Sequence, residues 1–365
     1  MKLCILDPGI QEHQGTPSFN LGDLVIQNAV DREISALFPG WEVIRYSTHQ
    51  PLNREQVRQV KQCSLILVGG TNLLSSRMWK FRQWKMSLSN LFALKNVVLM
   101  GVGWRQYQQP PDIITGRLLK GILSRGNLHS VRDSYTHSYL TGAGMRNVIN
   151  TGCPTMWPLD TLDQTQIPAH KAENVLVTLT EYSREPELDR QLLKIAKQKY
   201  KEVYFWAQGH RDMEYLAELD VPVTVLDHNF STFTDFVASN VSFDYVGTRL
   251  HGGVWCLVHK RRSLILQIDN RAKEIAKDTN LPIADRWDFD AIGKWIDGPV
   301  PSNIRVPSES INRWREQFRT LSQLTYERSA PAKDFSFPKA ICMDGEAILP
   351  KDIPFIAGGY EHKSS

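Results

Sequence analysis

The chain contains 365 residues, which is more than a single hydrophobic core usually organises and is typical of two domains of ordinary size. Its composition, 42% hydrophobic and 22% charged, excludes a disordered or fibrous protein. The formal net charge of +4 does not require a nucleic-acid partner, and it does not oppose an anionic ligand or an anionic membrane surface.

The first half of the chain alternates between two sequence patterns. Short runs of Val, Ile and Leu are typical of strands buried on both faces, and the stretches between them have helical periodicity. We predict strands at residues 2–7, 41–47, 63–70, 97–104, 128–132 and 147–152, and helices at 20–38, 54–62, 87–96, 114–126 and from 134 onward. This alternation predicts a Rossmann-like domain over residues 1–153.

A second series begins after residues 154–173, which hold three prolines and are predicted to be a linker. We predict strands at 174–182, 202–209, 222–227, 243–247 and 263–268, and helices at 186–200, 211–219, 230–239, 250–260 and 270–281. These elements predict a second Rossmann-like domain over residues 174–308. The fold class is therefore α/β, with two domains facing across a cleft where ligands bind beyond the carboxyl ends of the strands.

The last part of the chain departs from this alternation. Trp314, Phe318 and Leu321 recur at helical spacing, which predicts a long helix over residues 309–328 that crosses back to the first domain. Residues 329–365 are dominated by Pro, Gly and charge, and we expect an irregular tail there.

Cysteine and histidine placement points away from disulfides and metal sites. The five cysteines include no C-x-x-C pair, and the ten histidines include no H-E-x-x-H set. Residues 1–9 are typical of a strand rather than a signal peptide, and no run approaches the ~20 apolar residues of a membrane span. We expect a cytoplasmic protein with free thiols and no metal or other cofactor.

The segment RMWKFRQWK, residues 77–85, interleaves basic and aromatic side chains. We favour an amphipathic helix whose long basic side chains extend to solvent. Two alternatives stay open: stacking of a sugar on Trp79 or Trp84, and peripheral contact with the inner membrane surface, which would carry a lipid-linked acceptor.

The most informative segment is FDYVGTRLHGG, residues 243–253. A buried strand breaks at Gly247 and a helix follows, so Arg249 and His251 lie at a helix N-terminus. Unpaired backbone N–H groups and the helix dipole favour anions at such a position. A guanidinium group suits carboxylate or phosphate, and a neighbouring imidazole can transfer a proton near neutral pH. The segment predicts an anion-binding site with an acid–base group beside it.

At these residues the chain resembles the polysaccharide pyruvyl transferase family. GTRLHGGVWCL is similar to the family's R-L-H block, and three further blocks follow the family order at residues 20–30, 65–74 and 130–140. The resemblance covers roughly the first four fifths of the chain. It implies a fold like that of the GT-B glycosyltransferases and transfer of pyruvate from phosphoenolpyruvate onto a sugar of a cell-surface polysaccharide or its precursor, with a cyclic ketal as product.

The resemblance also implies roles for individual residues. Arg132 and Arg249 would hold the carboxylate and phosphate of phosphoenolpyruvate, and His251, as imidazolium, would protonate the donor's methylene carbon. We also expect substrate contacts from Leu250, Asn20, Gly70, Thr71 and Arg271, although Gly70 and Thr71 are better explained by a sharp turn of the loop over the cleft.

For several of these positions a structural role is an equal alternative. Asn20 and Asp23 suit the start of a helix, so Asp23 is either a catalytic base or a capping residue. Asp133 is similarly explained by a helix N-terminus, and Arg271 by a surface ion pair. Cys153 stands where the family usually has Asp, and Thr71 where it usually has Gly.

Two other classes of function stay open. A glycosyltransferase of the same shape would use a nucleotide sugar, and a non-catalytic protein would bind a glycan or anion without releasing phosphate. Neither alternative involves nucleic acid as a partner.

Overall fold

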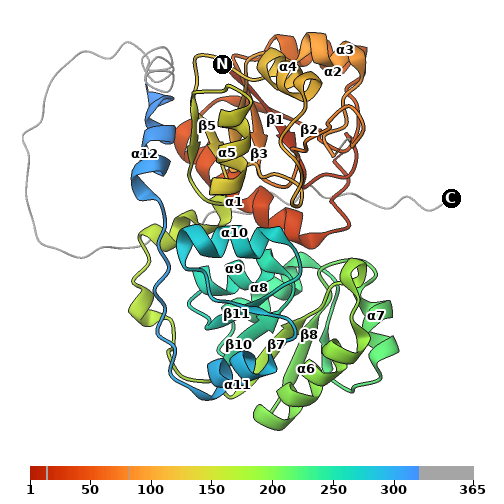
Figure 1. The fold of residues 1–365 in the computed structure, drawn as a ribbon, viewed down its shortest axis with the longest axis vertical. Coiled ribbons are helices and arrows are strands. Elements are labelled where there is room, and N and C mark those ends of the chain that lie inside the picture. The colour runs from red at the N-terminus through yellow and green to blue at the C-terminus, as the bar shows by residue number, and fades with distance from the viewer. Residues whose placement is uncertain (14, 82, 320–365) are drawn as a thin grey trace, which may run out of the picture.

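The computed structural model describes residues 1–13, 15–81 and 83–319, and Figure 1 shows two α/β domains stacked along the long axis. The predicted tail over 329–365 and the end of the predicted helix over 309–328 lie outside the described residues. Within the described part, no helix is both long and apolar enough to cross a membrane.

The first domain is built on parallel strands. β1 (Lys2–Asp7), β2 (Glu42–Ser47), β3 (Leu65–Gly69) and β4 (Val97–Met100) form a sheet in the order β2-β1-β3-β4. β5 (His129–Val131) and β6 (Val148–Asn150) pair in parallel, and the bridge between Val102 and Val131 joins β5 to the end of β4. The helices are α1 (Leu21–Leu37), α2 (Arg54–Lys61), α3 (Leu88–Ala93), α4 (Ile113–Ile122) and α5 (Ser134–Gly142).

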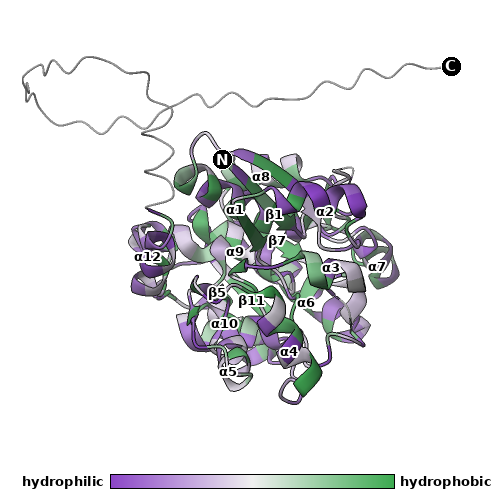
Figure 2. Ribbon diagram, turned by 90° about the horizontal axis from the view of Figure 1, so that it is seen from above, coloured by the Kyte–Doolittle hydropathy of each residue, from purple (hydrophilic) through white to green (hydrophobic). Residues whose placement is uncertain are grey.

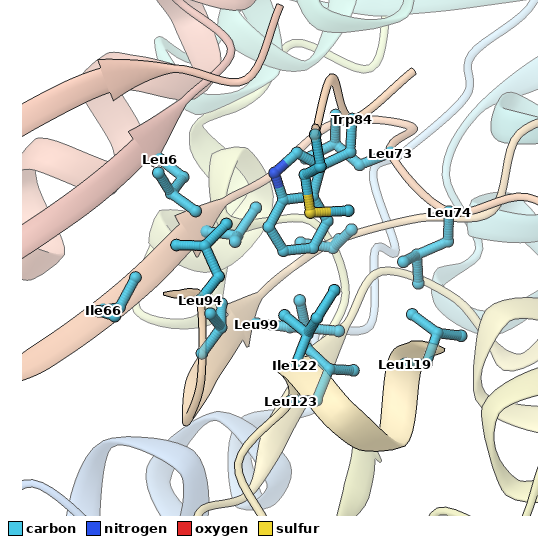
Figure 3. Close-up of a cluster of buried hydrophobic side chains, with 14 of the residues drawn as sticks. Leu6, Ile66, Leu73, Leu74, Trp84, Leu94, Leu99, Leu119, Ile122 and Leu123 are labelled. Atoms are coloured by element: carbon cyan, nitrogen blue, oxygen red, sulfur yellow. The ribbon is translucent and has the colours of Figure 1, made fainter. Parts of the chain in front are cut away.

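Both faces of this sheet are covered because its inner strands β1 and β3, and β4 beside them, are largely apolar. Cys4 and Leu6 of β1 point into one hydrophobic cluster, whereas Leu3 and Ile5 point into another on the opposite face. Figure 3 shows the first cluster, where Leu6 and Leu99 of the sheet meet Leu119 of α4. The two-residue alternation of strand side chains thus builds a core on each side of one sheet.

The second domain has a six-stranded parallel sheet in the order β12-β11-β10-β7-β8-β9. Its strands are β7 (Asn174–Thr178), β8 (Val203–Trp206), β9 (Thr224–Leu226), β10 (Phe243–Gly247), β11 (Ser263–Gln267) and β12 (Ile283–Asp285). Its helices are α6 (Pro186–Lys199), α7 (Asp212–Leu219), α8 (Phe230–Ala238), α9 (Leu250–Val258), α10 (Asn270–Thr279) and α11 (Phe289–Asp297). The chain adds strands to this parallel sheet on one side of β7 and then, from β10 onward, on the other. Ligands bind at such a switch point, here between β7 and β10. β12 and α11 were not predicted.

Two segments connect the domains. The first contains the 3₁₀ helices η1 (Pro154–Asp160) and η2 (Gln164–Gln166). The second leads into α12 (Ser308–Glu316), which lies beside the first domain in Figure 1. Ile311 and Trp314 pack in the cluster that contains Leu3 and Ile5, and Trp314 Nε1 donates to the carbonyl of Leu99 at 3.2 Å. The end of the described chain therefore contributes to the first domain's core.

One predicted helix is wrong. The described residues of segment 77–85 form turns, not an amphipathic helix. Trp84 is buried in the first domain's core, which excludes it from sugar stacking, and Trp79 Nε1 donates to Asp112 Oδ2 at 2.7 Å. Single buried side chains, Met78, Trp84 and Met86, anchor this segment in the core, and these tertiary contacts override its tendency to form a helix.

In the view from above, strands β1 and β7 are apolar and central, and the helices surround them (Figure 2).

Candidate active site between the domains

The start of α1 lies directly against the second domain. Leu21 N donates to the carbonyl of Gln208 at 2.9 Å, and Gln208 Nε2 donates to Asn20 Oδ1 at 3.0 Å. Gly22 has no side chain at this contact, and a Cβ there would collide with the Gln208 amide. Asn20 also caps α1, because its Oδ1 accepts from Gly22 N at 3.2 Å. Asn20 is therefore both a helix cap and an interdomain contact.

Helix α10 makes a further contact between the domains. Asp278 accepts from Ser134 N at 2.6 Å and Oγ at 2.7 Å, and from Asn150 Nδ2 at 2.8 Å. On the same helix, Glu274 accepts from the hydroxyl of Tyr107 at 2.6 Å. These bonds hold the carboxyl-end loops of the two sheets against each other, and the predicted site residues lie among those loops.

Asp23 is a buried carboxyl group on the first turn of α1. Ser18 Oγ donates to its Oδ2 at 2.9 Å. Burial raises the pKa of Asp23 to about 6, although the charge of Arg271 and the bond from Ser18 oppose this shift. A carboxyl group with a pKa near the working pH can act as a base, which a capping role alone does not explain.

Arg132 is fully buried at the carboxyl end of β5. Its Nε and Nη2 lie 3.0 Å from Asp133 Oδ2, and its Nη1 donates to Asn72. The guanidinium packs on Gly103, where a Cβ would collide with it. Nη2 has no partner in hydrogen-bond geometry beyond this ion pair, so Arg132 retains a donor for a ligand.

Asp133 has a structural explanation. It pairs with Arg132 and also caps α5, where it accepts from Thr136 N at 2.7 Å and Thr136 Oγ1 at 2.6 Å. Its oxygens are used by these contacts, so Asp133 positions Arg132 and starts α5.

His251 lies in the first turn of α9 and is almost completely buried. Its Nε2 is 3.9 Å from the Sγ of Cys153, across the domain boundary. Burial, and then the charges of Arg271 and Arg132, lower the pKa of His251 to about 3, with a small opposing effect from Asp269. This low pKa favours the neutral imidazole, and the expected role of His251 as a proton donor stays a prediction.

Arg271 follows β11 and lies on the same side as His251. Its Nε and Nη2 form a bidentate ion pair with Asp269 Oδ2 at 2.9 and 2.6 Å, and Nη2 donates to the hydroxyl of Tyr182 at 2.8 Å. The Asp269 and Tyr182 interactions raise the pKa of Arg271, so it is permanently charged. The ion pair that the sequence left as an alternative is present, and it borders the site.

Arg249 is held differently. Its Nε donates to Asp212 Oδ2 and to the carbonyl of Leu179, both at 3.1 Å, and its Nη2 donates to Glu181 and Asp212. The guanidinium is buried between these two carboxylates, and its Cζ lies 5.1 Å from the ring centre of Tyr182. These contacts give Arg249 a positioning role for the loops after β7 and β8, and its expected contact with the donor stays a prediction.

Three other predicted substrate-binding residues shape the backbone or the core. Leu250 is buried in the second domain's core with Val254. Gly70 has φ +71°, and a Cβ on it would collide with Ile26. Thr71 also has positive φ, and its carbonyl accepts from Gly103 N at 2.8 Å. Gly70 and Thr71 thus form the turn beneath Arg132.

Sequence reasoning did not identify several residues that border the site. Tyr182 bridges the two arginines of the second domain, Asp269 pairs with Arg271, and Asn72 accepts from Arg132. Asp269 was recognisable as the residue before a predicted helix after a strand, where a polar side chain is expected at the carboxyl edge of the sheet. Tyr182 and Asn72 gave no comparable signal.

A pocket of about 380 Å³ adjoins Asp269 at the carboxyl ends of β11 and β12. Its rim includes Trp287, whose side chain is 64% exposed, and Lys273. Glu185 and Asp285 contribute carboxylates to its lining. An exposed aromatic face beside hydrogen-bonding groups is suited to a sugar ring.

Among the described residues, no group of three or more His, Cys, Asp or Glu side chains is arranged to hold a metal ion. The cysteines of the described region are free, and burial raises the pKa of the Cys153 thiol. Thr155 Oγ1 donates to the Cys153 sulfur at 3.1 Å. Cys153 is therefore a protonated neighbour of His251 rather than an activated thiolate.

The fold is similar to those of two solved structures. For UDP-GlcNAc 2-epimerase from Methanocaldococcus jannaschii the TM-score is 0.52 at 11% identity, covering 89% of this chain and 100% of that one. For S. aureus MnaA, solved with UDP, the TM-score is 0.51 at 11% identity, covering 92% and 98%. This similarity shows the fold alone, and it confirms the predicted two-domain GT-B-like architecture.

No curated protein is significantly similar to the chain in sequence. Residues 20–270, more than half of the chain, match the family model described as polysaccharide pyruvyl transferase. The matched region includes the start of α1 and both Arg132 and His251. The chain therefore belongs to the polysaccharide pyruvyl transferase family.

Proposed function

We propose that the protein transfers pyruvate from phosphoenolpyruvate to a sugar of a cell-surface polysaccharide or its precursor and closes a cyclic pyruvate ketal. The observation that carries this proposal is the grouping of Arg132, Arg271 and His251 between the domains of a pyruvyl transferase family member. Two guanidinium groups from opposite domains suit a small donor that has a carboxylate and a phosphate.

The charge of the donor would change the protonation of His251. The positive charges of Arg271 and Arg132 contribute to the low pKa of His251. A carboxylate and a phosphate bound between them would offset those charges and raise the pKa of the imidazole. His251 would then carry a proton only when the donor is present, which limits wasteful reaction with water.

The reaction balances without a redox partner. A proton from His251 is added to the methylene carbon of the donor, and C2 becomes electrophilic. One acceptor hydroxyl adds to C2 and loses its proton to a base, for which Asp23 is suited by its pKa. A second hydroxyl of the same sugar then attacks C2 as the C–O bond to phosphate breaks. The sugar loses two hydroxyl protons in total. One replaces the proton that His251 gave to carbon, and the other is taken up by the leaving phosphate. Arg132 and Arg271 stabilise the charge on that phosphate.

The pocket beside Asp269 is the proposed acceptor subsite. Trp287 offers a flat apolar face for a pyranose ring, and Glu185 and Asp285 offer acceptors for its hydroxyl groups. Trp287→Ala should raise the KM for the acceptor about tenfold and leave the KM for phosphoenolpyruvate within about twofold, as expected for loss of one stacking contact. An equal rise in both constants would contradict this assignment.

The scheme requires no metal or other cofactor and no nucleic-acid partner. It uses a phosphorylated metabolite as donor, which agrees with the predicted cytoplasmic location.

Phosphate release from phosphoenolpyruvate in the presence of a panel of sugar acceptors tests the function directly. The expected result is acceptor-dependent phosphate release in a ratio of one to each ketal formed, with the ketal methyl group identified by NMR. Absence of phosphate release with every acceptor, together with saturable glycan binding, would favour a non-catalytic binding protein.

Thermal shift measurements separate the remaining alternative. The proposal predicts stabilisation by phosphoenolpyruvate and none by UDP-sugars. Stabilisation by UDP-sugars alone would favour a nucleotide-sugar glycosyltransferase and overturn the assignment of the donor.

A further inference from the structure

Four large apolar side chains gather on the first domain from two segments far apart in the sequence. They are Trp79 at 46% exposed, Phe81 at 48%, Ile113 at 74% and Ile114 at 58%. We call these four residues the apolar patch. Monomeric proteins commonly expose single apolar residues, whereas a group of this size marks an interaction surface.

Specific contacts hold the two segments of the apolar patch together. Trp79 Nε1 donates to Asp112 Oδ2 at 2.7 Å, and Met78 N donates to Thr115 Oγ1 at 3.1 Å. Met78 is buried in the first domain's core, next to the exposed Trp79. The apolar patch is therefore a formed surface anchored from beneath, not a set of independent side chains.

The charges around the apolar patch are mostly positive. Segments 77–81 and 112–117 carry three exposed basic residues, Arg77, Lys80 and Arg117, and one carboxylate, Asp112, which gives a local net charge of +2. Lys80 Nζ lies 5.8 Å from the ring centre of Phe81, so a cation and an apolar ring are presented together. Aromatic and aliphatic side chains bordered by Arg and Lys are suited to the boundary between lipid headgroups and acyl chains.

The apolar patch is linked to the interdomain site through one loop. Asp112 ends the loop that follows β4, and Tyr107 of that loop donates to Glu274 on α10. Helix α4, which begins at Ile113, lies at the periphery of the molecule in the view from above (Figure 2). A surface bound at the apolar patch would therefore lie beside the loops that border the site.

We propose that the apolar patch docks on an anionic phospholipid surface, with Trp79, Phe81, Ile113 and Ile114 inserted between headgroups and the basic residues paired with lipid phosphates. Docking of this kind brings a lipid-linked saccharide to the interdomain site, and only that consequence rests on the proposed function. Charge complementarity favours this occupant over a second copy of the chain. A two-fold dimer through the apolar patch would place its positive charges against their equivalents.

Vesicle co-sedimentation tests the proposal with the full-length protein. We expect binding to vesicles of phosphatidylcholine with phosphatidylglycerol, weak binding to phosphatidylcholine alone, and a loss of binding at high salt. The double variant Ile113→Asp/Ile114→Asp should reduce binding to the anionic vesicles by about tenfold or more. Both substitutions lie in the first turn of α4, where acidic residues are compatible with the helix dipole.

A matched control adds the same two negative charges elsewhere. Phe92 on α3 and Val225 on β9 are both exposed, so Phe92→Asp/Val225→Asp should leave vesicle binding within about twofold of the wild type. A wild type that does not bind anionic vesicles, or a control that loses binding as the patch variant does, overturns the proposal. So does a dimer that the patch variant dissociates in size-exclusion chromatography. If the patch variant misfolds by circular dichroism, Arg77→Glu/Arg117→Glu replaces it, with the same expected loss.

Activity provides an independent readout. The patch variant should retain the wild-type rate with a soluble saccharide acceptor and lose it only with a lipid-linked acceptor embedded in vesicles. If no pyruvate is transferred to any acceptor, the proposed function fails while the vesicle result stands. If the soluble reaction occurs but vesicle binding does not, the docking surface fails alone.

Discussion

The carboxyl ends of β10 and β11 are adjacent in one sheet and have the same strand–turn–helix design, yet their arginines differ. Arg249, after β10, is buried and paired with both Asp212 and Glu181. Arg271, after β11, pairs with Asp269 alone and turns towards Tyr182 and His251. A guanidinium that meets two buried carboxylates organises the fold, whereas one that meets a single carboxylate at a domain boundary can still bind an anion.

The largest expected effect concerns the imidazole at the end of β10. His251→Gln should lower kcat by about 10²–10⁴-fold and change the KM for phosphoenolpyruvate only severalfold, because it removes a proton donor rather than a binding charge. Steady-state phosphate release measures both constants. Cys153→Ala, which removes the neighbouring sulfur, is the control and should stay within about tenfold of the wild-type kcat. Wild-type turnover in the glutamine variant would remove His251 from the mechanism.

Arg249 and Arg271 should differ most in their contribution to the free energy of unfolding. Arg249→Ala leaves Asp212 and Glu181 without their cation, so the free energy of unfolding should fall by about 3–5 kcal/mol. Arg271→Ala should lower it by no more than about 1 kcal/mol, since both members of the Arg271–Asp269 ion pair are partly exposed. Urea denaturation of both variants measures the difference. Equal losses would show that the two ion pairs play the same role.

The order should be reversed for phosphoenolpyruvate, because loss of Arg271 should impair use of this donor more than loss of Arg249. Arg271→Ala should lower kcat/KM for phosphoenolpyruvate by about 10²–10³-fold, because it removes a charged donor that faces the proposed phosphate. Arg271→Lys should recover only part of this loss, since an ammonium group cannot reproduce a bidentate contact. The comparison would break if Arg249→Lys, measured below its unfolding transition, reduced donor affinity as much as Arg271→Lys.

Asp23 should show a smaller effect with a distinct pH signature. Burial raises its folded-state pKa to about 6, above the unfolded value, so the native state is destabilised as pH rises through that range. Asp23→Asn should therefore raise the free energy of unfolding by about 1–3 kcal/mol at pH 8 and leave it unchanged at pH 3.5. The acidic limb of the wild-type pH–rate profile near pH 6 should disappear in this variant. A pH-independent change in stability would indicate a helix-capping role instead.

Much of the fold could be predicted because the Val, Ile and Leu runs are local signals, and these runs form strands. The positions of Arg132 and His251 at strand ends followed from the same pattern. The two ion pairs of Arg249 could not be predicted, because Glu181 and Asp212 are distant from it in the sequence. The three residues come together only because the ends of β7, β8 and β10 lie close to one another in the fold. The low pKa of His251 likewise depends on burial and on two arginines from different segments. The predicted helix over residues 77–85 was wrong because single buried side chains, and not helical periodicity, determine the path of that segment.

Helix α10 carries Arg271, Glu274 and Asp278, so one helix connects the proposed anion-binding site to the contact between the domains. His251 and Arg132 are almost fully buried, so under the proposed function the domains would separate to admit reactants, and that movement would break the bonds from Tyr107, Ser134 and Asn150. Because Arg271 lies on the same helix, it would be withdrawn from the leaving phosphate in the same movement. The rate of opening would then set an upper limit on turnover.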